Sequence, residues 1–172
     1  GAETSLWEIA GRFAALARAA ATRAGARAGD GALFDLGLTR AELAARPRRP
    51  DPFSQGSANL ALDALTKVAR PEEEAAWEDY ASSRRIAWKT GTSFGYRDAW
   101  AVGVDGTYVA GVWVGNASGE GRPSLRGSAA AAPILFELFG LLGAGVNANI
   151  PLGNAAAPVD YQQAAAIGVL LT

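Results

Sequence analysis

Hydrophobic residues recur along this chain with two different periods, and the first period is that of a helix. The large apolar residues near the N-terminus stand at steps of three and four: Leu6, Ile9, Phe13 and Leu16. This spacing marks one face of an α-helix. Ser5 directly precedes the run and Glu8 stands three residues later, which is the spacing of a capping box, in which each side chain bonds the other residue's backbone N–H. The pattern predicts a helix over about residues 6–20.

A second run with helical spacing follows after two loop-like segments. Residues 24–32 are rich in glycine and residues 45–54 are punctuated by proline, so both predict loops. The apolar residues of the second run are Leu60, Leu62, Leu65 and Val68. We expect Ser57 to cap this helix and Pro71 to end it. The acidic residues 71–80 predict a short exposed helix or loop.

From Arg85 onward the pattern becomes that of strands. Residues 86–93, 99–105 and 108–115 are three β-like runs. The sequence FGYRD joins the first two, and Asp105-Gly106 joins the last two, which is a strong hairpin signal. We therefore expect an antiparallel meander. A loop over 116–128 and an apolar helix over 129–143, with Pro133 in its first turn, follow. Residues 144–172 have no clear pattern and are treated as a tail of unknown structure.

Composition narrows the chemistry that 172 residues of this kind can perform. A net charge of −1 gives no electrostatic case for binding nucleic acid or an anionic membrane. The chain has no Cys and no His, so thiolate nucleophiles, a Ser-His-Asp triad and His-ligated metal sites are excluded within it. No metal or organic cofactor is expected. A serine activated by a lysine needs neither His nor Cys and remains possible.

Lys89-Thr90-Gly91-Thr92, on the first predicted strand, is the motif that stands out. Lys89 is one of two lysines in a chain with 16 basic residues, the other being Lys67. A lysine on an edge strand can simply discourage pairing between sheets. However, K-T-G also belongs, with S-x-x-K and S-x-N elements, to the signature of penicillin-binding proteins and class A β-lactamases.

The resemblance extends beyond this motif. Residues 70–104, RPEEEAAWEDYASSRRIAWKTGTSFGYRDAWAVGV, and 108–139, YVAGVWVGNASGEGRPSLRGSAAAAPILFELF, resemble the C-terminal half of the transpeptidase domain of a class A penicillin-binding protein, most like the 1C type. Residues 1–18 resemble the helix that follows the family's S-x-N element. The resemblance implies an α/β fold of the α+β type, an antiparallel sheet packed with helices, as part of the serine β-lactamase and penicillin-binding transpeptidase fold. It implies a partial domain over residues 1–143.

The resemblance also implies the reaction and the residues that serve it. The family acylates a serine with the D-Ala-D-Ala end of a peptidoglycan stem peptide, or with a β-lactam that mimics it. Lys89 would be the catalytic residue of this chain, placing a positive charge near the serine and assisting proton transfer. Thr90, Gly91 and Thr92 would bind substrate, with Thr92 holding its carboxylate and supplying an oxyanion N–H. Gly91 would let the substrate backbone approach closely.

Two catalytic elements of the family are missing from these residues. No serine in the chain has a lysine three positions later, so the S-x-x-K nucleophile is absent and the chain alone is expected to be inactive. Ser57-Ala58-Asn59 spells S-x-N, but it lies on the wrong side of the first helix, and a helix cap is the preferred interpretation of Ser57. The parent protein is expected to be a glycosyltransferase–transpeptidase outside the cytoplasm, anchored in the membrane by a segment outside these residues.

Three features have simpler interpretations than catalysis. Arg97 and Asp98 are expected to form a local ion pair, or Asp98 to stabilise the turn. Glu72-Glu73-Glu74 is expected to form a solvated helix start rather than a metal site, and the tryptophans to line the core or a cleft. Three alternative functions stay open. They are a D,D-carboxypeptidase, a serine β-lactamase, and a non-catalytic module that binds cell-wall peptide or a protein partner.

Overall fold

A computed structural model describes residues 3–21, 53–71 and 84–142 in full, together with the backbone of a strand at 166–171. The expected glycine-rich loop, most of the proline-punctuated loop and the acidic segment with its Glu72-Glu73-Glu74 run lie outside the described residues. Within the described part, no helix is long and apolar enough to cross a membrane.

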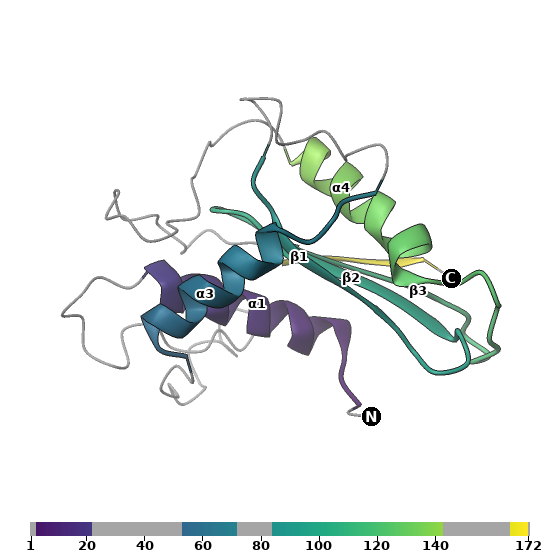
Figure 1. The fold of residues 1–172 in the computed structure, drawn as a ribbon. Helices are drawn as coiled ribbons and strands as arrows, with labels where there is room; N and C mark the ends of the chain where they lie inside the picture. The colour runs from purple at the N-terminus through teal and green to yellow at the C-terminus, as the bar shows by residue number, and fades with distance from the viewer. Residues whose placement is uncertain (1–2, 22–52, 72–83, 143–165, 172) are drawn as a thin grey trace, which may run out of the picture.

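A single sheet separates two layers of helices (Figure 1). The helices α1 (Leu6–Ala21) and α3 (Gln55–Thr66) pack on one face, and α4 (Ala132–Leu141) packs on the other. The sheet order is β1-β2-β3-β4. Its strands are β1 (Ala87–Thr92), β2 (Asp98–Val104), β3 (Val109–Gly115) and β4 (Ala166–Leu171). The predicted mixed α+β class with an antiparallel meander is confirmed.

The fourth strand was not predicted. β4 pairs with β3 in parallel, with Val109 opposite Ala166. Its sequence, AIGVLL, is apolar and includes β-branched residues, and this composition was the available signal for a strand. A parallel partner needs a long connection rather than a tight turn, so no local motif announces its position in the sheet.

Helix α1 begins as predicted. The Ser5 backbone N–H donates to the Glu8 carboxylate at 2.8 Å, and the Glu8 N–H donates to the Ser5 hydroxyl at 3.2 Å. These reciprocal bonds satisfy backbone donors that have no partner inside the helix. They also lower the pKa of Glu8, chiefly through the bond from the Ser5 backbone N–H and then through the Ser5 and Thr4 hydroxyls.

The predicted cap of the second helix was wrong by three residues. Ser54 is the N-cap of α3, with extended backbone angles, and its hydroxyl accepts the N–H of Ser57 at 3.1 Å. Ser57 therefore lies inside the first helical turn. The error arose because both positions carry a serine, and only the backbone conformation distinguishes the cap from the first turn.

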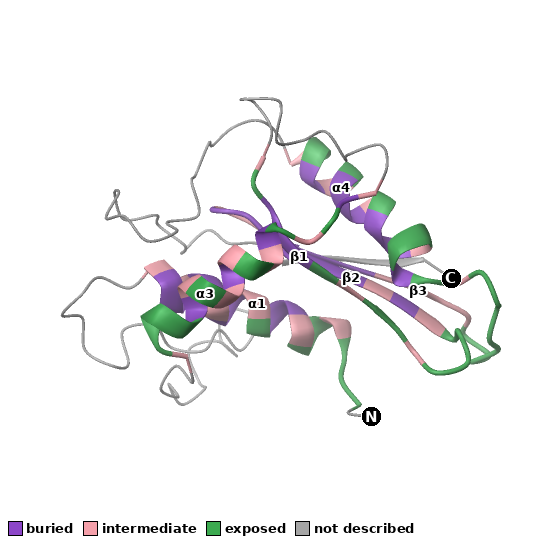
Figure 2. Ribbon diagram, in the orientation of Figure 1, coloured by how far each residue is buried: buried purple, intermediate pink, exposed green. Residues whose placement is uncertain are grey.

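The predicted hairpin and the predicted apolar helix are both present. Asp105 and Tyr108 close the β2–β3 turn, with the Asp105 N–H donating to the Tyr108 carbonyl at 3.0 Å. Helix α4 has Pro133 in its first turn, and a π-helical turn, η3 (Gly127–Ala131), leads directly into it. Along α4 the side that faces the sheet is buried and the opposite side is exposed (Figure 2).

Candidate functional site

The Lys89–Thr92 motif forms the C-terminal part of β1, which is an edge strand. β1 pairs with β2, and within the described residues no strand lies on its other side. The Ser93 N–H donates to the Asp98 carbonyl at 2.9 Å, so this pair is hydrogen-bonded. Because bonded and non-bonded pairs alternate in an antiparallel ladder, the backbone N–H and C=O groups of Thr92 and Thr90 point away from β2. Two residues of the motif thus present backbone donors and acceptors at the open edge.

An open groove of about 570 Å³ lies along this edge, on the side of the sheet that carries α1. Its apolar wall combines Ile9 and Phe13 of α1 with Trp100 and Val102 of β2. Its other side includes all four motif residues, together with Glu3, Thr4, Ser93 and Asp98. The sequence pattern predicted the motif strand but not the contribution of α1, because the helical period shows only that Ile9 and Phe13 share a face.

The side chains of the motif alternate between the two faces of the sheet. Lys89 and Gly91 lie on the α1 side, and Lys89 is exposed. The Lys89 Nζ donates to the Thr90 carbonyl at 2.6 Å. This bond holds the ammonium group at the open edge, beside an outward-pointing backbone carbonyl.

Gly91 is not required by the fold. Its φ angle is outside the left-handed region. A Cβ placed on it would meet the Trp100 Cβ at 3.6 Å, which is ordinary van der Waals contact. Neither strain nor crowding therefore explains why this position is a glycine. The missing side chain leaves the adjacent part of the groove open.

Thr90 and Thr92 lie on the opposite face, which carries η3 and α4. The Thr92 hydroxyl accepts the backbone N–H of Gly127, the first residue of η3, at 3.0 Å. A Cβ on Gly127 would lie 2.9 Å from the Thr90 Cβ. The turn before α4 is thus packed tightly against the motif. Gly127 has no sequence signal of its own, because its role depends on a contact 35 residues away.

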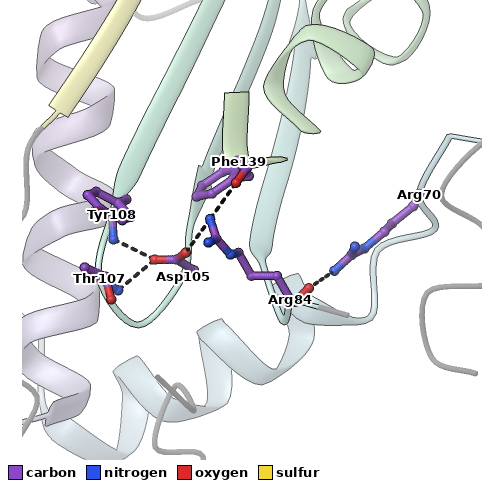
Figure 3. Close-up of polar contacts among 6 residues, drawn as sticks. All are labelled: Arg70, Arg84, Asp105, Thr107, Tyr108 and Phe139. Atoms are coloured by element: carbon purple, nitrogen blue, oxygen red, sulfur yellow. Dashed lines mark hydrogen bonds and ion pairs between the residues drawn. The ribbon is translucent and has the colours of Figure 1, made fainter. Parts of the chain in front are cut away.

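A buried polar cluster fixes the residue that leads into β1 (Figure 3). Arg84 lies 3.3 Å from the Asp105 carboxylate and donates to the Phe139 carbonyl at 2.6 Å. The Asp105 carboxylate also accepts the N–H groups of Thr107 and Tyr108, at 2.7 and 2.6 Å. The cluster therefore ties the approach to β1, the β2–β3 turn and the end of α4 together.

Arg84 is also bound by Arg70. Arg70 donates to the Arg84 carbonyl at 2.7 Å, and its guanidinium lies 4.9 Å from the centre of the Phe136 ring. Asp105 is only 4% exposed, so these charges interact with little screening by water.

The simpler interpretation of two tryptophans is confirmed, whereas the Asp98 carboxylate bonds a neighbouring strand and not the turn. Only the backbone of Asp98 contributes to the turn, since its N–H donates to the Ser93 hydroxyl at 2.8 Å. Its carboxylate accepts the indole N–H of Trp113 at 2.9 Å. Trp88 is buried at 2% exposure, in edge contact with Phe136, and Trp100 lines the groove. Among the described residues, no group of three or more His, Cys, Asp or Glu side chains is arranged to hold a metal ion.

One known protein is similar to a large part of this chain. Over 99 residues the chain is 38% identical to penicillin-binding protein 1C of Escherichia coli (strain K12), and the match covers 58% of this chain. It covers 12% of that relative, so the chain corresponds to a small part of a much longer protein. No family model matches the chain, and no solved structure matches it. The matched residues are therefore similar to a region of a penicillin-binding protein.

Proposed function

We propose that residues 1–143 are the C-terminal part of the transpeptidase domain of a peptidoglycan D,D-transpeptidase, which cross-links the cell wall and is a target of β-lactams. The observation that carries this proposal is the open edge of β1 at Lys89–Thr92, which borders the groove. An extended peptide can add to such an edge by main-chain hydrogen bonds. The peptide in question would be the D-Ala-D-Ala end of a stem peptide.

Lys89 would stabilise negative charge in the site and assist proton transfer. Its ammonium group lies at the edge where the scissile bond would sit, within 2.6 Å of the Thr90 carbonyl. The positive charge of a lysine there would stabilise the developing alkoxide and attract the substrate carboxylate. Unlike arginine, lysine can also give up its proton. The position of its Nζ near an unpaired backbone edge supports this role.

Thr92 would serve in two ways. Its backbone N–H points away from β2, where it could donate to the oxyanion of a tetrahedral intermediate. Thr92 is one of the residues that line the groove, and its hydroxyl could donate to the substrate's terminal carboxylate. Thr90 would form part of the same strand edge, and Gly91 would let the peptide backbone come close.

The nucleophile would come from outside these residues. Ser93 borders the groove, but its hydroxyl accepts the Asp98 N–H. It stands four strand residues from Lys89, which is about 13 Å along a strand and too far for direct proton transfer. We propose that a longer polypeptide supplies an S-x-x-K serine to this groove, works outside the cytoplasm, and also carries a membrane anchor and a glycosyltransferase domain.

The test compares two proteins, the chain as printed and the longer polypeptide encoded at the same locus. Each is incubated with a fluorescent penicillin, and its intact mass is measured. We expect one β-lactam per molecule on the longer polypeptide and none on the chain as printed. An adduct on the printed chain would show that one of its own serines is the nucleophile. No adduct on the longer polypeptide would favour the non-catalytic binding module.

The site itself is tested in the longer polypeptide by substitution. Lys89→Ala should slow acylation by about a hundredfold or more, which is the usual scale for a group that assists proton transfer, with little change in melting temperature. The matched control is Lys67→Ala, since Lys67 is the other lysine and lies exposed on the surface. Equal acylation rates in the two variants would remove Lys89 from the site.

Two further measurements separate the enzymatic alternatives. Rapid hydrolysis of the penicillin adduct would indicate a β-lactamase. With a stem-peptide substrate, release of D-Ala to water alone would indicate a carboxypeptidase, whereas transfer to an added amine would support the transpeptidase.

A further inference from the structure

Gly127 occupies a position in the packing that only glycine can fill. A Cβ on this residue would lie 2.5 Å from the Gly91 carbonyl oxygen and 2.7 Å from the Trp100 carbonyl oxygen. Both are backbone atoms of the β1–β2 ladder, so neither can move aside without disturbing the sheet. The φ angle of Gly127 is outside the left-handed region. Close approach, and not backbone conformation, therefore requires a glycine here.

The close approach brings the N–H of Gly127 to the motif. This N–H begins the π-helical turn, where a backbone donor has no partner within the helix. It donates instead to the Thr92 hydroxyl, 3.0 Å away. The contact spans from the start of η3 to the end of β1, and it links the packed face of the sheet to the open edge.

This bond determines what the Thr92 hydroxyl can do. A hydroxyl has one proton to donate and two acceptor lone pairs. The Gly127 N–H uses an acceptor site, and within the described residues the Thr92 hydroxyl has no acceptor for its own proton. The side chain is thereby held in one orientation, its proton has no acceptor among the described residues, and Thr92 is one of the residues that line the groove.

We propose that Gly127 is a positioning residue that orients the Thr92 hydroxyl as a donor to an anionic group in the groove, namely the terminal carboxylate of the bound peptide or β-lactam. The inference rests on the proposed function for the identity of the anion. The hydrogen bond itself is independent of that function. Gly127 acts through Thr92 and does not touch the substrate.

The test measures selectivity for the carboxylate. In the longer polypeptide, acylation rates are measured with benzylpenicillin and with its methyl ester, which lacks the negative charge. The rate with benzylpenicillin divided by the rate with the methyl ester reports the contribution of the carboxylate contact. Gly127→Ala and Thr92→Val should each lower this ratio by about tenfold to a hundredfold, because a hydrogen bond to a charged group is lost or misaligned. Combining them should lower it little further, since both act on one contact.

Two additional variants separate positioning from general damage. Gly140→Ala, on an exposed helix position where a Cβ meets nothing within 4 Å, is the control and should keep the ratio. Thr92→Ser keeps the hydroxyl without the methyl group. It should keep the ratio as well, because the Gly127 N–H alone can hold the hydroxyl. This variant tests the proposal even if Gly127→Ala fails to fold.

The hydrogen bond is also measured directly on the chain as printed. Amide hydrogen exchange at Gly127 should speed up in Thr92→Val and stay slow in Thr92→Ser. If the unaltered longer polypeptide forms no β-lactam adduct, both the proposed function and this inference fail. If the adduct forms but the ratio is unchanged in Gly127→Ala, or lost in Thr92→Ser, only the inference is overturned.

Discussion

The two faces of the sheet differ in how completely they are filled. The α4 face holds a continuous apolar cluster that includes Trp88, Leu135, Phe136 and Phe139, all of them buried. On the α1 face the buried helix residues are mostly alanines, and a groove remains open next to Lys89 and Gly91. One strand, β1, lies between these two environments. Its motif is thus supported rigidly from one side and accessible from the other.

Two glycines show the same difference at the scale of single atoms. At Gly127, on the α4 side, an added Cβ would collide with backbone oxygens. At Gly91, on the α1 side, it would make only ordinary contact. A glycine that packing does not require, beside an unpaired strand edge, fits a requirement imposed by a ligand.

The largest expected effect comes from opening a cavity on the filled face. Leu135→Ala should lower the free energy of unfolding by about 2–5 kcal/mol, because Leu135 is fully buried and the surrounding side chains cannot collapse completely. Denaturant unfolding monitored by circular dichroism gives this value. Leu141, on the same helix, is 77% exposed. Leu141→Ala should cost no more than about 0.5 kcal/mol, and similar losses in the two variants would contradict the assigned core.

A smaller effect is expected at the buried polar cluster. Asp105→Asn should cost about 1–3 kcal/mol, because it weakens the bonds from Thr107 and Tyr108 and leaves the nearby Arg84 charge uncompensated. The same substitution at Asp63 removes an exposed ion pair with Lys67. Asp63→Asn should therefore cost about 0.3–0.5 kcal/mol. A loss at Asp105 no larger than that at Asp63 would mean that the cluster does not anchor the approach to β1.

The smallest effect should depend on pH. The pKa of Glu8 is held below its ordinary value of 4.5, chiefly by the Ser5 backbone N–H. A lowered pKa in the folded state means that the carboxylate stabilises the fold above the unfolded pKa, and that this contribution is lost as the pH falls through the folded pKa. The melting temperature of Glu8→Gln should be slightly below that of the unaltered chain at neutral pH.

That difference should vanish in strong acid, where the Glu8 carboxyl is protonated in both states. Glu137→Gln, at an exposed position of α4, is the control for the loss of one surface carboxylate. A Glu8→Gln difference that stays constant from neutral pH to strong acid would exclude the capping box as its source.

Local signals in the sequence predicted most of the described fold. The capping box at Ser5 and Glu8, the strand periods and the Asp105-Gly106 turn all act over a few residues, and each appears where expected. The cap of α3 was misplaced because two serines three residues apart carry the same signal. Strand β4 was missed because its position depends on pairing with a distant strand and not on a neighbouring turn.

The candidate site was predictable only in part, for the same reason. The motif on β1 could be recognised from four consecutive residues. The groove wall from α1, the anchoring of Arg84 by Asp105, and the contact between Gly127 and Thr92 join residues that are far apart in sequence. A local sequence pattern does not predict contacts between distant residues, and these contacts are seen only in the structure.

We propose that substrate binds along the open edge of β1 and that Gly91 is a glycine for that reason. The most direct measurement is the acylation rate of the longer polypeptide carrying Gly91→Ala, determined with benzylpenicillin alongside its melting temperature. A Cβ here meets Trp100 only at an ordinary 3.6 Å, so stability should change by no more than about 0.5 kcal/mol. The methyl group would stand where the proposed substrate backbone would pass, so the acylation rate should fall by about tenfold or more. An unchanged rate with unchanged stability would contradict the claim that substrate binds along this edge.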